Sequence, residues 1–157
     1  MTTLNILTSP IINGTPRGNG IQTITLKNGT GAGNYTYSTD TNYADVDATN
    51  LVHVTFIPRG WNLTIFAHGS MTNTSVAATV FVGLFIDTEV VTAVPYQETT
   101  AGNVAPWALH WTIGGVDSTH LVKLQFKTSS TLSPAVISNG ATGNRPSMLF
   151  ILQPTRE

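Results

Sequence analysis

Cysteine is absent from the 157 residues of this chain, and only 10% of its residues are charged. The lack of cysteine excludes disulfides, thiolate nucleophiles and cysteine-based metal sites. An average soluble protein has roughly 25% charged residues, so the polar surface here must come mainly from Thr, Ser, Asn and Gln. Such a surface favours packing against other subunits, because few charges have to be desolvated at an interface.

Positive charge is scarce and scattered as well. Seven Lys and Arg stand against eight Asp and Glu, for a net charge of −1. Without a basic stripe, the sequence predicts no nucleic-acid partner. The longest apolar run, 76–86, is interrupted by Thr79 and Gly83 and is too short to span a bilayer, which predicts no membrane partner. The first residues lack the basic and apolar regions of a signal peptide, so none is expected.

Helical periodicity is missing, whereas Thr, Val and Ile are abundant and Gly, Pro and Asn recur about every ten residues. This pattern is typical of an all-β protein. Eight strands are expected, the count of a jelly-roll or similar Greek-key β-sandwich. They are predicted near 50–57, 61–69, 77–86, 89–95, 106–113, 119–128, 132–138 and 145–152.

Residues 1–34 differ from the rest of the chain, because Gly- and Asn-rich turn segments separate short apolar pieces. We predict an extended N-terminal arm over 1–34 and a β-sandwich domain over 35–157, with 21–27 as a candidate first strand. A disordered N-terminus is the alternative. The arm anchors, expected to dock on a neighbouring subunit, are Leu4, Ile6, Leu7, Ile11 and Ile12.

The segment 50–69 is predicted to form a β-hairpin with its turn at 58–60. In that register apolar residues oppose one another on one face, as the two-residue period of a strand demands. The predicted pairs are Val52 with Ala67, Val54 with Ile65, and Phe56 with Leu63.

Two strands carry apolar residues on both faces, although a sandwich strand normally alternates apolar and polar positions. Such residues on the outside of a sheet mark an interaction surface. We therefore predict a homo-oligomer built on the outer face of one sheet; alternatively, the arm covers part of that face within one subunit. The predicted interface residues are Phe66, Phe81, Phe85, Leu149 and Ile151.

No catalytic site, metal site or cofactor is predicted, so the sequence indicates a protein that is not an enzyme. By alternation His53, His68 and His110 lie on polar faces, whereas His120 shares the apolar face of its strand and is interpreted as a structural residue. None of their spacings resembles a metal motif. Asp87 belongs to a predicted hairpin turn, and neither a Gly-x-Ser-x-Gly elbow nor a phosphate loop occurs.

Aromatic residues supply the candidate ligand contacts. Trp107 and Trp111 share a face with aliphatic residues and are expected in the core. Trp61 at a hairpin corner and Tyr43 in a Tyr-rich loop are the positions predicted to contact a ligand such as a sugar.

The segment Gly114-Gly-Val-Asp-Ser-Thr-His-Leu-Val-Lys-Leu-Gln-Phe-Lys-Thr128 is followed by a last strand, Arg145-Pro-Ser-Met-Leu-Phe-Ile-Leu152. A Gly/Asn-rich arm, a cysteine-free body and these two strands resemble small jelly-roll virion proteins of tailed bacteriophages, in particular capsid decoration (auxiliary or cement) proteins. The resemblance covers roughly residues 50–152.

The resemblance implies a homotrimer on the capsid surface or tail of a virion, made in the host cytoplasm. Its arms would clasp neighbouring subunits, and its expected partner is the major capsid protein or another virion protein. The alternative is a carbohydrate- or receptor-binding head of a phage tail fibre or spike.

Overall fold

The computed structural model describes residues 2–6, 22–30, 33–37, 42–73, 78–97, 102–115, 117–130, 134–138 and 145–155. Within these ranges the chain forms twelve β-strands and no helix. The strands are β1 (Thr2–Ile6), β2 (Gln22–Asn28), β3 (Tyr35–Tyr37), β4 (Ala44–Asp45), β5 (Val52–Ile57), β6 (Trp61–Asn73), β7 (Thr79–Ile86), β8 (Glu89–Gln97), β9 (Ala105–Gly114), β10 (Ser118–Thr128), β11 (Ala135–Ile137) and β12 (Ser147–Pro154).

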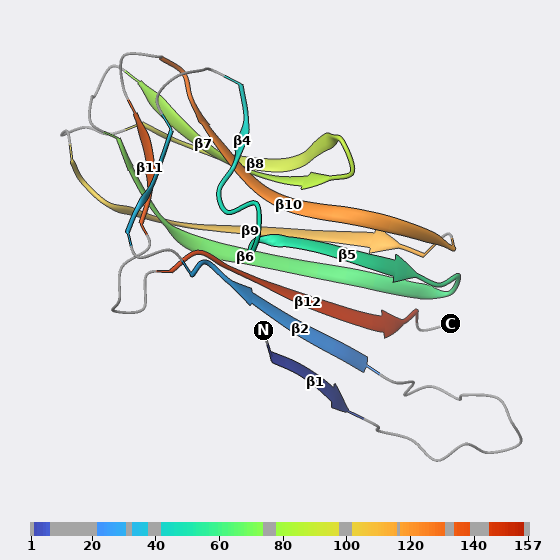
Figure 1. Ribbon diagram of the computed structural model, residues 1–157. Helices are drawn as coiled ribbons and strands as arrows, with labels where there is room; N and C mark the ends of the chain where they lie inside the picture. Colours follow the sequence, from blue (N-terminus) through green and yellow to red (C-terminus); the bar gives the residue numbers. More distant parts are fainter. Residues whose placement is uncertain are drawn as a thin grey trace, which may run out of the picture.

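Eight of these strands form two antiparallel four-stranded sheets that face each other (Figure 1). One sheet, the β6 sheet, has the order β2-β12-β6-β9. The other, the β10 sheet, has the order β5-β10-β7-β8. Because successive strands repeatedly cross from one sheet to the other, this order is that of a jelly roll. The predicted fold class is therefore confirmed.

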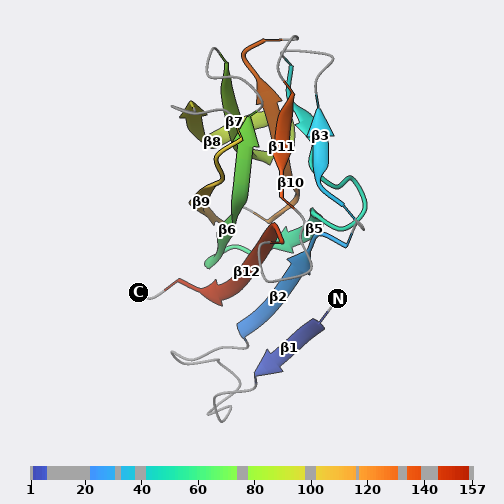
Figure 2. The same ribbon diagram turned by 90° about the vertical axis from the view of Figure 1, so that its left-hand side faces the viewer.

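Short strands extend both sheets. Figure 2 shows β12, β2 and β1 following one another at one edge of the β6 sheet. At its other end β6 pairs with β11, which in turn pairs with β3. In the β10 sheet, β4 makes a two-residue pairing with β10.

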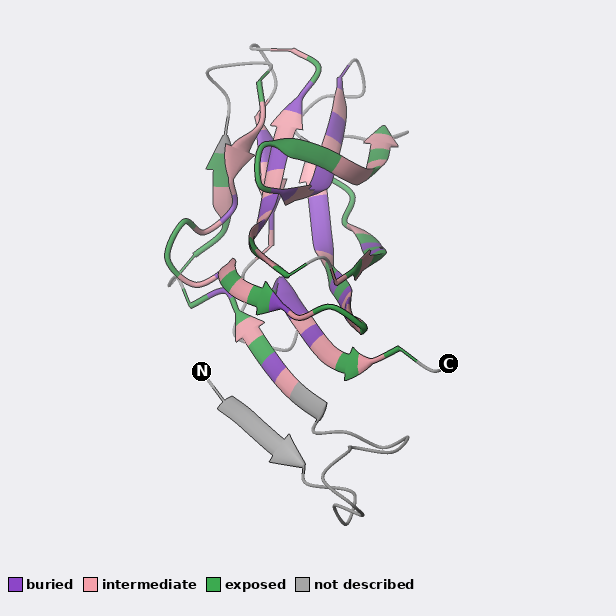
Figure 3. Ribbon diagram, turned by 90° about the vertical axis from the view of Figure 1, so that its right-hand side faces the viewer, coloured by how far each residue is buried: buried purple, intermediate pink, exposed green. Residues whose placement is uncertain are grey.

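A single layer of apolar side chains fills the space between the sheets. Alternate residues of each strand point into this layer, as the two-residue period requires. In Figure 3 the buried positions accordingly alternate with intermediate and exposed ones along the strands. The innermost residues include Leu63, Ile65, Met148 and Phe150 from the β6 sheet and Val80, Val82, Leu84, Val122 and Leu124 from the β10 sheet.

The hairpin predicted for 50–69 is wrong. β5 pairs with β10, which places Val54 opposite Leu121, whereas β6 pairs with β9 and β12. Residues 58–60 instead carry the chain from one sheet to the other. Val54 and Phe56 are 61% and 51% exposed and Ile57 is fully buried, so β5 buries the face opposite to the predicted one. Alternation identifies which residues share a face, but it cannot identify the neighbouring strand.

Every predicted strand segment contains a strand, but the eight jelly-roll strands are not those eight. The segment 132–138 forms the short β11 at the side of the sandwich. The eighth jelly-roll strand is β2, which lies within the predicted arm at the candidate first strand 21–27 and pairs with β12 over six residues. Two of the predicted anchors, Leu4 and Ile6, lie in β1 opposite Ile24 and Gln22. The other three, Leu7, Ile11 and Ile12, lie outside the described residues.

Asp47 fixes the turn that leads into β5. Its carboxylate accepts hydrogen bonds from the Tyr35 hydroxyl at 2.7 Å and from the backbone N–H groups of Thr49 and Asn50 at 3.1 and 2.9 Å. Partial burial by itself raises the pKa of Asp47, but these donors outweigh it and lower the pKa to about 2. The ionised carboxylate thus joins β3 to the turn.

A lowered pKa means that ionised Asp47 stabilises the folded state above the unfolded-state pKa near 4, and that this contribution is lost as the pH falls toward 2. We expect Asp47→Asn to lower the free energy of unfolding at pH 7 by roughly 1–2 kcal/mol, allowing for solvent screening. The difference from wild type should shrink between pH 4 and pH 2. Urea unfolding at several pH values measures this difference, with Glu89→Gln at the exposed first residue of β8 as control. Equal acid sensitivity of wild type and Asp47→Asn would contradict the assignment.

The corrected strand order can be tested by engineered disulfides, because the chain has no cysteine of its own. Paired residues of adjacent antiparallel strands have Cα atoms about 4.5–5.5 Å apart, within disulfide range, whereas facing sheets lie about 10 Å apart. Val54→Cys with Leu121→Cys should cross-link on mild oxidation. Val54→Cys with Ile65→Cys, a pair of the rejected hairpin, should stay reduced. Mass spectrometry of the unreduced variants distinguishes them, and the opposite result would restore the hairpin.

Candidate functional site

The outer surface of the β6 sheet carries a band of apolar side chains that runs across its strands. Strand register puts Leu26, Leu149 and Phe66 side by side in one row on β2, β12 and β6. The next row holds Ile24, Ile151 and Thr64. Leu26 and Phe66 are 38% and 41% exposed, and the other apolar members are partly exposed. Three of the predicted interface residues therefore lie together on this surface.

This outer surface also lacks Asp, Glu, Lys and Arg at the described positions of the four strands. When a partner covers this surface, no permanently charged side chain at these positions has to be desolvated. The positions, by strand register, are Ile24, Leu26 and Asn28; Ser147, Leu149, Ile151 and Gln153; Asn62, Thr64, Phe66 and His68; and Ala108, His110, Thr112 and Gly114.

Several polar groups of this surface are already paired with one another. The Ser147 hydroxyl lies 2.7 Å from His68 Nε2, and the hydroxyls of Thr64 and Thr112 are 3.4 Å apart. The ring of His110 stacks obliquely against Phe66, with centroids 4.9 Å apart. Because these polar groups already have partners within the same chain, a subunit that covers the surface leaves fewer of them without a hydrogen bond.

The outer surface of the β10 sheet has a different character. Phe81 and Phe85 of β7 lie there, where Lys127 Nζ sits 5.1 Å from the Phe81 ring centroid and the Tyr43 ring packs edge-on at 4.9 Å from that of Phe85. Burial against these neighbours raises the pKa of Tyr43. Lys123 and Asp45 form an ion pair on the same surface, with Nζ and Oδ2 3.4 Å apart. Phe81 and Phe85 are thus partly covered by the chain itself and lie among charges, whereas Val54 and Phe56 of β5, on the same surface, are 61% and 51% exposed.

The five predicted interface residues thus divide between two surfaces on opposite sides of the core. Phe66, Leu149 and Ile151 belong to the β6 sheet, whereas Phe81 and Phe85 belong to the β10 sheet. The alternation of side chains along each strand showed that each of these residues faces outward. It could not show which sheet each strand joins.

The predicted ligand contacts are also separated. Tyr43 lies on the outer surface of the β10 sheet, and Trp61 begins β6, where it is half-buried against the core. Trp107 is in the core as expected, but Trp111 is 39% exposed. His53 is half-buried with its ring centroid 4.4 Å from that of Phe150, so its predicted position on a polar face is wrong. Burial, and then the charge of Lys27, lower the pKa of His53.

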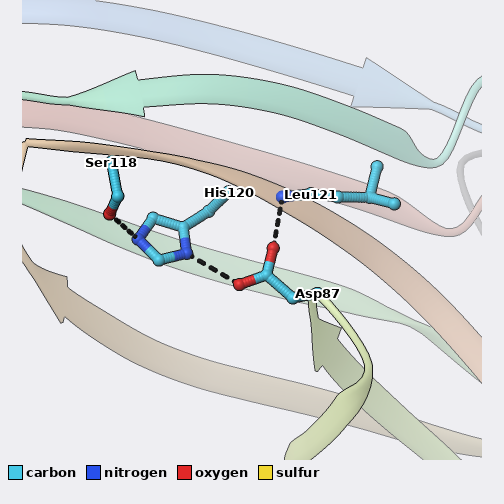
Figure 4. A network of polar contacts seen from close by, with 4 residues as sticks. All are labelled: Asp87, Ser118, His120 and Leu121. Carbon is cyan, nitrogen blue, oxygen red and sulfur yellow. Dashed lines mark hydrogen bonds and ion pairs between the residues drawn. The ribbon is translucent and has the colours of Figure 1, made fainter.

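A polar cluster at one end of the sandwich was missed by the sequence analysis. Ser118 Oγ lies 2.7 Å from His120 Nε2, and His120 Nδ1 lies 2.9 Å from Asp87 Oδ2 (Figure 4). The other Asp87 oxygen accepts the backbone N–H of Leu121 at 2.9 Å. The spacing of Ser118 and His120 already puts both on one face of a strand. Asp87 joins them only because β7 pairs with β10.

The described part of the chain has neither a cluster of metal ligands nor a membrane-spanning helix. No group of three or more His, Asp or Glu residues there is arranged to hold a metal ion. The described residues also form no helix that is long and apolar enough to cross a membrane.

No protein-family model and no curated protein matches this sequence. Similar solved structures come from infectious bursal disease virus. Its VP2 subviral particle is 12% identical over 96% of this chain and 42% of that chain, with a TM-score of 0.46. Its derived T=1 particles are 11% identical over 94% of this chain and 41% of that chain, with a TM-score of 0.48. The chain spans less than half of either protein, and at these TM-scores the likeness adds nothing to the jelly roll that the strand order establishes.

Proposed function

We propose that this protein is a structural subunit of a virion that assembles with other subunits through the outer surface of the β6 sheet. The observation that carries the proposal is the band formed by Leu26, Leu149, Phe66 and their neighbours, on a surface whose described positions carry no permanent charge. A water-exposed sheet would normally present polar and charged residues there.

The size of this surface favours repeated contacts over one strong contact. Four strands about 4.8 Å apart span about 19 Å, and the stretch of β6 from Asn62 to His68 is about 23 Å long. A partner would therefore cover about 440 Å² in projection on each side, below the roughly 800 Å² per partner of a standard interface. In a closed shell many such contacts act together, so weak pairwise association becomes strong through multivalency.

The more specific role that we propose is decoration of a tailed-phage capsid, with the major capsid protein as partner. It rests on the resemblance of residues 50–152 and on the predicted arm. Since β2 is part of the β6 sheet, we place the arm before Gln22. β1 is the outermost strand of the described sheet, and an outermost strand can accept another strand on its unpaired edge.

Deleting residues 1–20 tests the role of the arm. The shortened chain should keep its sandwich, because the eight jelly-roll strands remain, but should no longer bind capsid shells that lack the protein. Co-sedimentation with shells measures binding, and near-ultraviolet circular dichroism checks the fold. Unchanged binding by a folded, shortened chain would exclude the arm from the interface.

A matched pair of phenylalanines tests the interaction surface. Phe66 and Phe56 are 41% and 51% exposed, on the β6 and β10 sheets respectively. Phe66→Asp should weaken self-association at least tenfold, because it places a charge in the covered band, whereas Phe56→Asp should change it little. Sedimentation velocity over a concentration series measures the self-association of both variants and also gives the oligomer count.

A trimer needs two different surfaces on each subunit, whereas pairing one surface with itself gives a dimer. Equal losses in both variants would contradict the assignment to the β6 sheet.

The alternative function, a carbohydrate- or receptor-binding head of a tail fibre, predicts a different result. Glycan binding that disappears on changing Trp61 or Tyr43, with self-association intact, would favour that role over capsid decoration.

A further inference from the structure

Three side chains from two elements converge at the end of the sandwich where β7 turns into β8 (Figure 4). Ser118 and His120 are two residues apart on β10 and therefore share a face of the strand. Asp87 follows β7 in the left-handed region, with φ of 58°. The three side chains form a chain of two hydrogen bonds. The first joins Ser118 Oγ and His120 Nε2 at 2.7 Å, and the second joins His120 Nδ1 and Asp87 Oδ2 at 2.9 Å.

Hydrogen-bond chemistry determines which atom donates in this line when the imidazole is neutral. An ionised carboxylate only accepts, so His120 Nδ1 must carry the proton that points at Asp87. His120 Nε2 then holds a lone pair, and the Ser118 hydroxyl must donate to it. This is the arrangement of nucleophile, general base and orienting carboxylate found in serine hydrolases of unrelated folds.

The carboxylate is held rigidly enough to orient the ring. Asp87 and Leu121 exchange two hydrogen bonds, from Leu121 N to Asp87 Oδ1 at 2.9 Å and from Asp87 N to Leu121 O at 2.7 Å. The first of these bonds, and then the bond to His120, lower the pKa of Asp87, which keeps it ionised. The His120 side chain is only 16% exposed, so its ring has little freedom to rotate away from Ser118 and Asp87.

A second serine–histidine pair shows what is particular about this cluster. Ser147 Oγ also lies 2.7 Å from a histidine Nε2, that of His68. Within the described residues, however, His68 has no carboxylate at its other nitrogen, and Ser147 is 5% exposed. Ser118 is less buried than Ser147 and belongs to the complete triad.

We propose that Ser118 is a base-activated nucleophile that accepts an acyl group from an activated carboxylic ester. Ser118 Oγ attacks the carbonyl carbon and gives its proton to His120 Nε2. When the carbon–oxygen bond to the leaving group breaks, His120 returns that proton to the departing oxygen. The products are the free alcohol or phenol and an acyl ester on Ser118. This acylation goes beyond the structural role and needs no turnover.

The experiment treats the folded full-length chain with a fluorophosphonate probe and, separately, with p-nitrophenyl acetate, and locates the modified residue by peptide mass spectrometry. One label on Ser118 is expected, and none in Ser118→Ala. His120→Gln and Asp87→Asn should slow labelling about 100-fold or more, the usual contribution of a general base. Asn tolerates the left-handed conformation, so Asp87→Asn keeps the turn while removing the charge.

Ser129→Ala is the matched control, because Ser129 is an exposed serine whose Oγ accepts a hydrogen bond from Thr79 N at 2.8 Å. Its labelling rate should equal that of wild type. Thermal unfolding of every variant establishes that it is folded at the labelling temperature. Three results would each overturn the proposal: labelling spread over several serines, no labelling of a folded wild-type chain, or an unchanged labelling rate in folded His120→Gln. The cluster would then serve only to stabilise the turn between β7 and β8.

Discussion

Two four-stranded sheets share one layer of apolar side chains, and this sharing constrains every other surface of the molecule. Each strand fills the layer with alternate residues, so the residues between them must face away from the core. In β6, Leu63, Ile65 and Ala67 are buried, and Phe66 is consequently forced outward. Leu149 is forced outward in the same way between Met148 and Phe150 on β12. The outer apolar band follows from the same alternation that builds the core.

The two outer surfaces then differ in what surrounds their apolar residues. On the β10 sheet, Lys127 and Tyr43 lie against Phe81, Gly83 and Phe85, so part of that surface is covered by the chain itself. On the β6 sheet, the neighbours of Phe66 are Leu149 and His110, and the band continues to Leu26. The absence of permanent charge at its described positions makes the β6 surface the better candidate for contact with another subunit.

Sequence reasoning succeeded where local pattern determines the result. Turn residues and β-branched residues located every predicted strand segment, and alternation correctly placed Trp107 in the core and Phe66 and Leu149 on an outer face. It failed where the result depends on the neighbouring strand. The apolar face of β5 was expected to be buried against β6, but β5 pairs with β10 and buries the opposite face, which includes Ile57. Likewise, the contact of Asp87 with His120 depends on the β7–β10 pairing across 33 residues of sequence.

β2 illustrates a second reason for the failure. Its residues Gln22–Asn28 are flanked by Gly- and Asn-rich segments, so the sequence located a candidate strand at 21–27 but assigned it to the arm instead of the sandwich. Their membership in the sheet is a consequence of six residue pairs with β12, a contact between the two ends of the chain. Such long-range pairing leaves no mark in a local window of sequence.

We propose that neighbouring subunits cover the outer surface of the β6 sheet in the assembled particle. Hydroxyl-radical footprinting of the free chain and of the particle tests this most directly, by comparing oxidation at Phe66 and Leu149 with oxidation at Phe56 and Val54. We expect strong protection of Phe66 and Leu149 on assembly and little change at Phe56 and Val54. Protection of Phe56 and Val54 with continued oxidation of Phe66 and Leu149 would contradict it.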